Sequence, residues 1–162
     1  MLTVKQIKTL AGPAITDKAL CKYPVDIRCN EKSWSDGTIL FYEPCPKVAY
    51  EPQPLTEGHE VLTNRMLAES IIPVYPVEIR GYGDLKAIRF TNGEQGTWFD
   101  GKLVNALVKR AGKVPVTFMY NDYFKSLAVH NGKPLGMVMA LRESRLTEDC
   151  DWNFAYTGDL PA

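Results

Sequence analysis

The amino-acid sequence predicts an α+β protein, one compact domain in which units of a helix and antiparallel strands are repeated. The main observation is a near-repeat. Residues 23–28 (Tyr-Pro-Val-Asp-Ile-Arg) return as residues 75–80 (Tyr-Pro-Val-Glu-Ile-Arg), with a looser echo at residues 114–118. A segment with helical apolar spacing precedes at least two of the three copies, and each copy opens a β-rich segment. Self-similarity of this kind indicates a fold built by stacking one unit.

The bulk composition is that of an ordinary globular chain. The 162 residues are 45% hydrophobic and 23% charged, with 19 cationic and 19 acidic side chains. A net charge of zero means that any nucleic-acid surface must be local. No apolar run reaches the roughly 20 residues of a membrane span, and the N-terminus has no secretory apolar core, so we expect a cytoplasmic protein with no membrane partner.

The first third is predicted to begin with a helix over residues 4–11. Thr3 and Gln6 have the spacing of a capping box, in which side chains and backbone at a helix start satisfy each other. Residues 24–28 and 38–42 carry the apolar, β-branched and aromatic side chains of strands. We therefore expect one helix followed by two strands.

A proline-rich connector over residues 43–56 is the predicted internal boundary of the domain. It separates two sub-units, residues 1–42 and 57–142. Its four prolines prevent a central strand or helix and favour an exposed, semi-extended segment. A proline-rich ligand for a partner domain is the alternative to a plain linker.

The remaining elements follow from apolar spacing and turn residues. Helices are predicted over residues 57–70 and 101–111, the second behind Asp100 as N-cap. Strands are predicted over residues 76–80, 85–90, 97–99, 114–120, 126–130 and 135–141. Residues 143–162 are predicted to be an acidic tail, or an edge strand because Trp152, Phe154 and Tyr156 alternate.

Six cations mark a candidate nucleic-acid surface on two of these helices. They are Lys5, Lys8, Lys102, Lys109, Arg110 and Lys113. On a helical wheel they lie away from the apolar side, and no acid interrupts either helix. Uninterrupted cations suit phosphate contacts. Ordinary solvated helix faces are the alternative interpretation.

Residues 99–142 resemble the closing segment of a bacterial DNA polymerase sliding clamp (β-clamp) domain. The shared order is a short strand ending at Phe99, a helix led by Asp100, a strand at residues 114–118, the hairpin at residues 126–132, and Val-Met-Ala-Leu-Arg at residues 138–142. The resemblance implies a DNA-clamp-like fold with helices facing double-stranded DNA, and self-association into a homo-oligomer. It places the same six cations against the DNA backbone.

A turn at residues 121–125 is the candidate contact for a protein partner. Tyr123, Phe124 and Lys125 carry it, and exposed aromatic side chains are enriched at protein interfaces. Hairpin packing is the alternative for the two rings. Tryptophans such as Trp98 are expected in the core rather than as a stacking platform for single-stranded bases.

The sequence contains no nucleophile elbow, no phosphate-binding glycine–lysine loop and no Cys-x-x-Cys pair. We therefore predict no catalytic residue, no cofactor and no metal. The resulting hypothesis is a non-catalytic, DNA-associated replication-accessory module. The alternative is a small cytosolic regulator or inhibitor, of a phage or plasmid type, that binds protein and has no nucleic-acid role.

Overall fold

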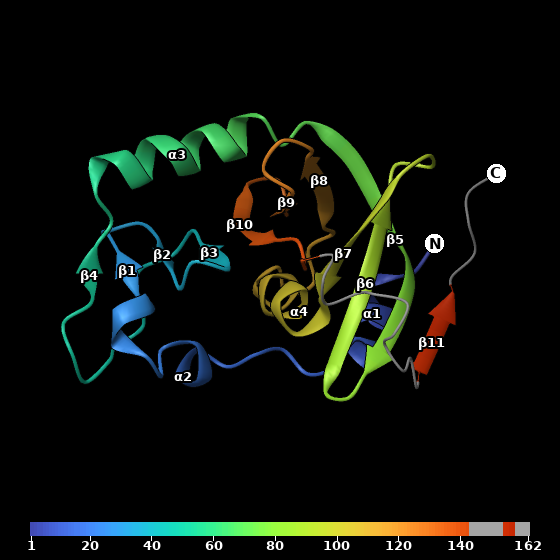
Figure 1. The fold of residues 1–162 in the computed structure, drawn as a ribbon, viewed down its shortest axis with the longest axis horizontal. Helices are drawn as coiled ribbons and strands as arrows, with labels where there is room; N and C mark the ends of the chain where they lie inside the picture. Colours follow the sequence, from blue (N-terminus) through green and yellow to red (C-terminus); the bar gives the residue numbers. More distant parts are fainter. Residues whose placement is uncertain (143–153, 158–162) are drawn as a thin grey trace.

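One mixed, mostly antiparallel sheet organises the described residues, 1–142 and 154–157, of this computed structural model (Figure 1). Its strand order is β4-β1-β2-β3-β10-β9-β8-β5-β6-β7, and β11 pairs with β5 beside this path. The β1–β4 pair is parallel, whereas the other strand pairs in the described residues are antiparallel. Together with four α-helices, the sheet forms a single α+β domain, as predicted.

The elements have the following bounds. The helices are α1 (Val4–Leu10), α2 (Asp17–Leu20), the 3-10 helix η1 (Pro24–Asp26), α3 (Glu57–Ala68) and α4 (Gly101–Arg110). The strands are β1 (Arg28–Cys29), β2 (Trp34–Ser35), β3 (Ile39–Phe41), β4 (Gln53–Pro54), β5 (Ile72–Tyr82), β6 (Leu85–Thr91), β7 (Gly96–Asp100), β8 (Thr117–Asn121), β9 (Ser126–His130), β10 (Pro134–Met139) and β11 (Phe154–Thr157).

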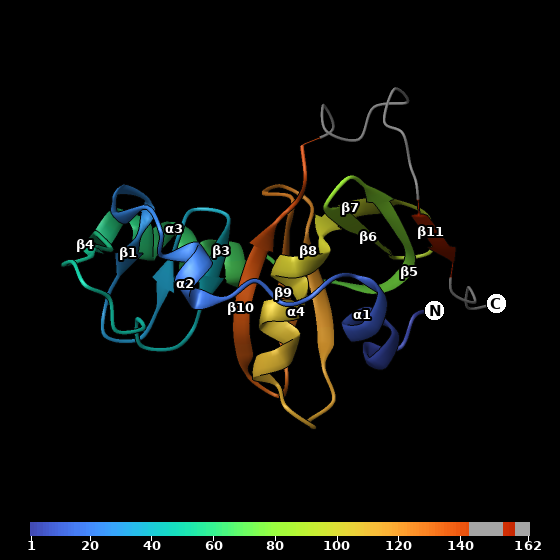
Figure 2. The same ribbon diagram turned by 90° about the horizontal axis from the view of Figure 1, so that it is seen from below.

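The central strands separate two hydrophobic clusters because successive strand side chains point to opposite faces. Leu127 and Val138 face the larger cluster, which also contains Leu107 of α4. Ala128 faces a smaller cluster that includes Met66 of α3. Figure 2 shows α1, α2 and α4 in front of the sheet, and Figure 1 shows α3 on the opposite side. Three helices therefore share one face of the molecule.

Helix α4 packs closely on its neighbours because two glycines leave room for it. A Cβ added at Gly136 of β10 would lie 2.5 Å from the Cδ2 atom of Leu107 and 2.1 Å from the carbonyl oxygen of Leu40. A Cβ at Gly101 would lie 2.3 Å from the carbonyl oxygen of Ala11. Real Cβ atoms do not approach this closely, so these glycines set the depth at which α4 is buried.

A buried asparagine joins α4 to the end of α1. The Nδ2 atom of Asn105 donates hydrogen bonds to the carbonyl oxygens of Ile7, at 3.2 Å, and Gly12, at 2.6 Å. The Ile7 oxygen also accepts the N–H of Ala11 at the end of α1, and Gly12 lies two residues beyond the helix. Asn105 therefore ties α4 to the end of α1 and to the residues that follow it.

The three main predicted helices are confirmed, with ends that differ by one or two residues. The capping box of Thr3 and Gln6 is present at the start of α1. Asp100 caps α4, with its side chain accepting a hydrogen bond from the N–H of Lys102. Thr56, the residue before the helix, caps α3.

The predicted strand over residues 24–28 is wrong, because residues 24–26 form the 3-10 helix η1 and strand β1 begins only at Arg28. The second copy of the near-repeat lies within strand β5. The third copy enters a strand only at Thr117. The sequence repeat is therefore not a structural repeat. Among the described residues no long strand lies beside residues 24–27, and local bonds hold their backbone together with one from Gln53.

The connector lies within a continuous sheet. Residues 43–52 form no helix or strand, and Gln53–Pro54 is the short strand β4. Strand β3, before the connector, pairs with β10, far beyond it. At the C-terminus, Phe154–Thr157 pairs antiparallel with β5, whereas the rest of the predicted acidic tail, with Trp152, lies outside the described residues. None of the helices in the described part has the length and apolar character needed to cross a membrane.

Candidate nucleic-acid interface

The three helices on one face of the sheet carry a marked excess of positive charge. Residues 1–22 and 101–113, which contain α1, α2 and α4, hold eight lysine and arginine side chains and one acid, Asp17. Because the whole chain is neutral, the remainder is net acidic. This distribution separates charge across the molecule, as a surface for polyanions requires.

Six of these cations are exposed lysines, and they define what we call the helix face: Lys5, Lys8, Lys18, Lys22, Lys109 and Lys113. Within residues 1–142 and 154–157, none of them forms an ion pair with a carboxylate. The Nζ atom of Lys22 lies 5.7 Å from the ring centroid of its neighbour Tyr23. The helix face is therefore a set of cations that form no ion pair with a carboxylate of the described residues.

Arg110 differs from these lysines because its guanidinium is used inside the protein. It pairs with the carboxylates of Glu43 and, at 2.8 Å, Asp17, and it lies 3.9 Å from the ring centroid of Phe41. Burial of the side chain opposes its charge, but the hydrogen bonds to Glu43 and Asp17 outweigh this effect and raise the pKa of Arg110. Arg110 joins α4 to α2 and to the connector, so it has little capacity left for phosphate.

Lys102 and Lys109 have local environments that reduce their availability. Lys109 lines a small depression with Asp17 and Glu43, where acids offset its charge. Lys102 is half-buried, with its Cγ atom 3.7 Å from the position that a Cβ of Gly12 would occupy. The strongest part of the helix face is therefore formed by the lysines of α1 and α2 and by Lys113.

Sequence reasoning missed Lys18 and Lys22. Their signal is the same as that of Lys5 and Lys8, since residues 1–22 contain four lysines and a single acid. The four-residue helix α2 is too short to show a periodic pattern, so a wheel could not display its cationic side. Charge counted along the segment would have found both residues.

The predicted partner-binding turn is rigidly supported. The Oδ1 atom of Asn121 accepts hydrogen bonds from the backbone N–H groups of Tyr123 and Phe124, at 3.0 Å each. Its Nδ2 atom donates to the carbonyl oxygen of Met66, also at 3.0 Å, which ties the turn to α3. The guanidinium of Arg65 lies 5.5 Å from both ring centroids.

The three predicted contact residues of this turn have different environments. Tyr123 is 75% exposed, whereas Phe124 packs against the smaller hydrophobic cluster. Lys125 has a left-handed backbone, with φ at 55°, and pairs with Asp122 at 2.8 Å. That hydrogen bond raises the pKa of Lys125. Of the two rings, Tyr123 therefore presents the larger accessible surface.

The described residues bring together no three histidine, cysteine, aspartate or glutamate side chains as a metal site would require. Cys21, Cys29 and Cys45 are free thiols. Burial raises the pKa of Cys45 to about 11, so this thiol is protonated at neutral pH and is a poor nucleophile.

Comparisons of the chain with known protein families, with curated proteins and with solved structures found no match. The geometry described above therefore carries the functional argument. What the helix face offers is a group of cations without a nucleophile or a buried acid–base pair, an arrangement that suits binding of an anionic polymer.

Proposed function

We propose that the protein binds the phosphate backbone of duplex DNA through the helix face, as a non-catalytic, replication-accessory module. One observation carries the proposal: six exposed lysines without carboxylate partners in the described residues lie on or directly after three helices that cover one side of the sheet (Figure 2). Each lysine that contacts a phosphate releases a counterion, which favours binding without sequence readout.

The test is a charge reversal on the helix face. The variant Lys5→Glu/Lys8→Glu/Lys113→Glu changes three exposed side chains that make no ion pair in the described structure. We expect its affinity for a short labelled duplex to fall at least about tenfold in fluorescence anisotropy. The slope of log affinity against log salt should become less steep by about 0.9 for each phosphate that the variant no longer neutralises.

The matched control reverses three exposed lysines elsewhere. Lys32 follows β1, Lys47 lies in the connector, and Lys133 lies between β9 and β10. The variant Lys32→Glu/Lys47→Glu/Lys133→Glu has the same net charge as the helix-face variant, so both variants have the same long-range repulsion from DNA. Equal loss of affinity in the two variants, or no binding of duplex at low salt by the unmodified protein, would refute the proposal.

The resemblance to sliding clamps gives this proposal a narrower form. In that form several copies assemble, and their helix faces surround the duplex. A clamp-like homo-oligomer should sediment as a closed assembly and remain on circular DNA at a salt concentration that releases it from linear DNA. If the protein is a monomer and salt releases it equally from circular and linear DNA, the clamp-like hypothesis is wrong and only binding to the DNA backbone remains.

A second candidate function is protein binding through the turn at residues 121–125. The observation that favours it is the 75% exposure of Tyr123, whose ring is held by Arg65 and by an edge contact with Phe124. Aromatic side chains of this kind are common anchors of interfaces. If this candidate is correct, Tyr123→Ala should abolish recovery of a specific partner in cross-linking experiments while leaving affinity for DNA unchanged.

A further inference from the structure

The strands from β10 to β7 close on themselves around a cavity. Strand β7 is last in the sheet order, yet the carbonyl oxygen of its Trp98 accepts a hydrogen bond, at 2.9 Å, from the N–H of Leu141, just beyond β10. The cavity, which opens to solvent, has a volume of about 770 Å³. Its described lining comes from β5 to β8, the adjoining turns and residues 140–142, with none from α4. The volume is in the range of small-molecule sites.

Aromatic side chains line the cavity at different depths. Phe90 and Phe99 meet edge to face, with ring centroids 5.7 Å apart, and Tyr120 meets Phe99 at 6.3 Å. Trp98 is half-buried in the lining, and the guanidinium of Arg80 lies 5.5 Å from its ring centroid. Phe90 and Phe99 are 2% and 0% exposed, so they form a packed floor, and the half-buried ring of Trp98 is the surface on which a flat aromatic ligand can stack.

Amide and hydroxyl groups line the same cavity. The Oδ1 atom of Asn92 accepts hydrogen bonds from the backbone N–H groups of Glu94 and Gln95, at 3.0 Å each, which leaves its NH₂ group to offer a ligand. Gln95 is exposed at the cavity, and the hydroxyl of Thr97 donates to the Tyr120 hydroxyl oxygen at 3.2 Å. An aliphatic chain would leave these groups unused, whereas a nucleobase edge offers donors and acceptors.

Two cations lie at the rim of the cavity. Arg142 is exposed and has no carboxylate partner among the described residues, and Lys125 pairs with Asp122. Arginine binds phosphate with two parallel N–H groups. Arg142 therefore gives the rim one cation for an anionic group attached to an aromatic body, because the charge of Lys125 is offset by Asp122.

We infer that this cavity binds a single unstacked nucleotide, with the base against Trp98 and the phosphate at Arg142. The nucleotide can be free or part of a single strand, since both offer the same chemistry. The site shares no residue with the helix face, so it does not depend on duplex binding. Charge reversal at Lys5, Lys8 and Lys113 should leave it intact.

The experiment is isothermal titration of the protein with adenosine 5′-monophosphate, adenosine, inorganic phosphate, dodecanoate and a single-stranded oligothymidylate. Adenosine should bind about tenfold more weakly than the monophosphate because it lacks the charged group. Arg142→Gln should weaken the monophosphate about tenfold and leave adenosine unchanged. Trp98→Leu should weaken both, since it removes part of the wall that contacts the base.

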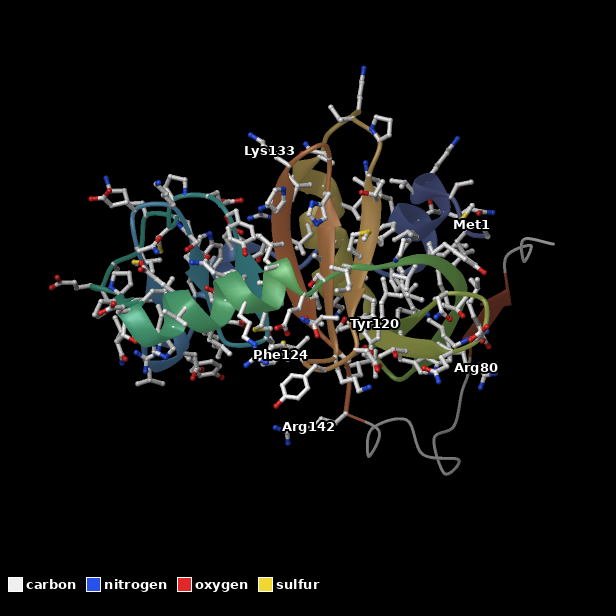
Figure 3. All side chains as sticks on the ribbon, turned by 90° about the horizontal axis from the view of Figure 1, so that it is seen from above. Met1, Arg80, Tyr120, Phe124, Lys133 and Arg142 are labelled. Atoms are coloured by element: carbon white, nitrogen blue, oxygen red, sulfur yellow. The ribbon has the colours of Figure 1, made fainter. Side chains whose placement is uncertain are left out.

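The matched control is Lys133→Gln, which removes one exposed cation at the opposite end of the central strands (Figure 3). Its nucleotide affinity should equal that of the unmodified protein. Tighter binding of the oligothymidylate than of the monophosphate assigns the site to a single strand, and the reverse assigns it to a free nucleotide.

Three results would overturn the inference. The first is the absence of heat from both the monophosphate and the oligothymidylate at millimolar concentration. The second is tighter binding of dodecanoate than of either nucleotide ligand. The third is an affinity of Arg142→Gln, a change at an exposed position, equal to that of the unmodified protein.

Discussion

Residues 23–28 and 75–80 have the same sequence except for Asp26 against Glu78, yet they adopt different backbones. The first segment contains the 3-10 helix η1, and the second lies in the longest strand of the described sheet, β5. Val25 is 72% exposed, whereas the equivalent Val77 is fully buried. An almost identical hexapeptide therefore does not determine its own secondary structure.

The neighbours of the two segments explain the difference. Strand β5 has β6 along one edge and β8 and β11 along the other, so its backbone groups find partners in a ladder. The first segment has short local bonds instead, such as the one from the N–H of Asp26 to the carbonyl oxygen of Tyr23, at 3.1 Å. What the segments share is burial of the isoleucine: Ile27 and Ile79 are both 0% exposed. The shared sequence therefore specifies which side chain is buried, the isoleucine, whereas the neighbouring strands decide whether the backbone forms a strand or a turn.

The largest expected effect on stability comes from removing the buried isoleucine of either segment. Ile27→Ala and Ile79→Ala should each lower the free energy of unfolding by about 2–5 kcal/mol, because each leaves a cavity in the same hydrophobic cluster. Urea unfolding monitored by circular dichroism would measure both. A cost at Ile27 below about 1 kcal/mol would show that the first segment is not anchored in the way described.

The second largest effect is a difference in stability between valine substitutions in the two segments. Val77→Ala should cost about 2 kcal/mol of unfolding free energy, since the side chain is fully buried. Val25→Ala removes the same atoms from an exposed position and should change stability by less than about 0.5 kcal/mol. Each variant is the control for the other in parallel urea titrations. Equal costs would mean that the two segments have the same environment, and the comparison would fail.

The smallest effect is expected when the two hexapeptides are made identical. Asp26→Glu should change the free energy of unfolding by less than about 0.5 kcal/mol, because Asp26 is exposed. If context selects the backbone, amide hydrogen exchange at residues 25–27 should remain faster than at residues 77–79. Slow, strand-like exchange in the variant would show that the single side chain, rather than the neighbours, makes the difference.

The accuracy of the sequence-based prediction follows the range of the interactions involved. The cap of α1 involves residues three positions apart, and the cap of α4 is one side chain at the helix start, so both could be recognised in the sequence. The role of Arg110 could not, because Glu43 and Asp17 lie 67 and 93 positions away. A wheel identified a cation but gave no information on its partners.

The candidate sites show the same limit. Lys5 and Lys8 were found from local charge, and the structure places their helix beside α4 on one face of the sheet. The nucleotide cavity depends on the approach of Leu141 to Trp98, which no local pattern predicts. Cations on one helix can be predicted from sequence, whereas a cavity between distant strands requires the fold.

The two hydrogen bonds by which Asn105 ties α4 to the end of α1 have a consequence for folding during synthesis. The two carbonyl oxygens that it binds belong to residues made 98 and 93 positions earlier. At ribosomal rates of about 5–20 residues per second, they wait roughly 5–20 s for their partner to be made. The contacts that fix the end of α1 against the sheet are therefore completed only after α4 has been made.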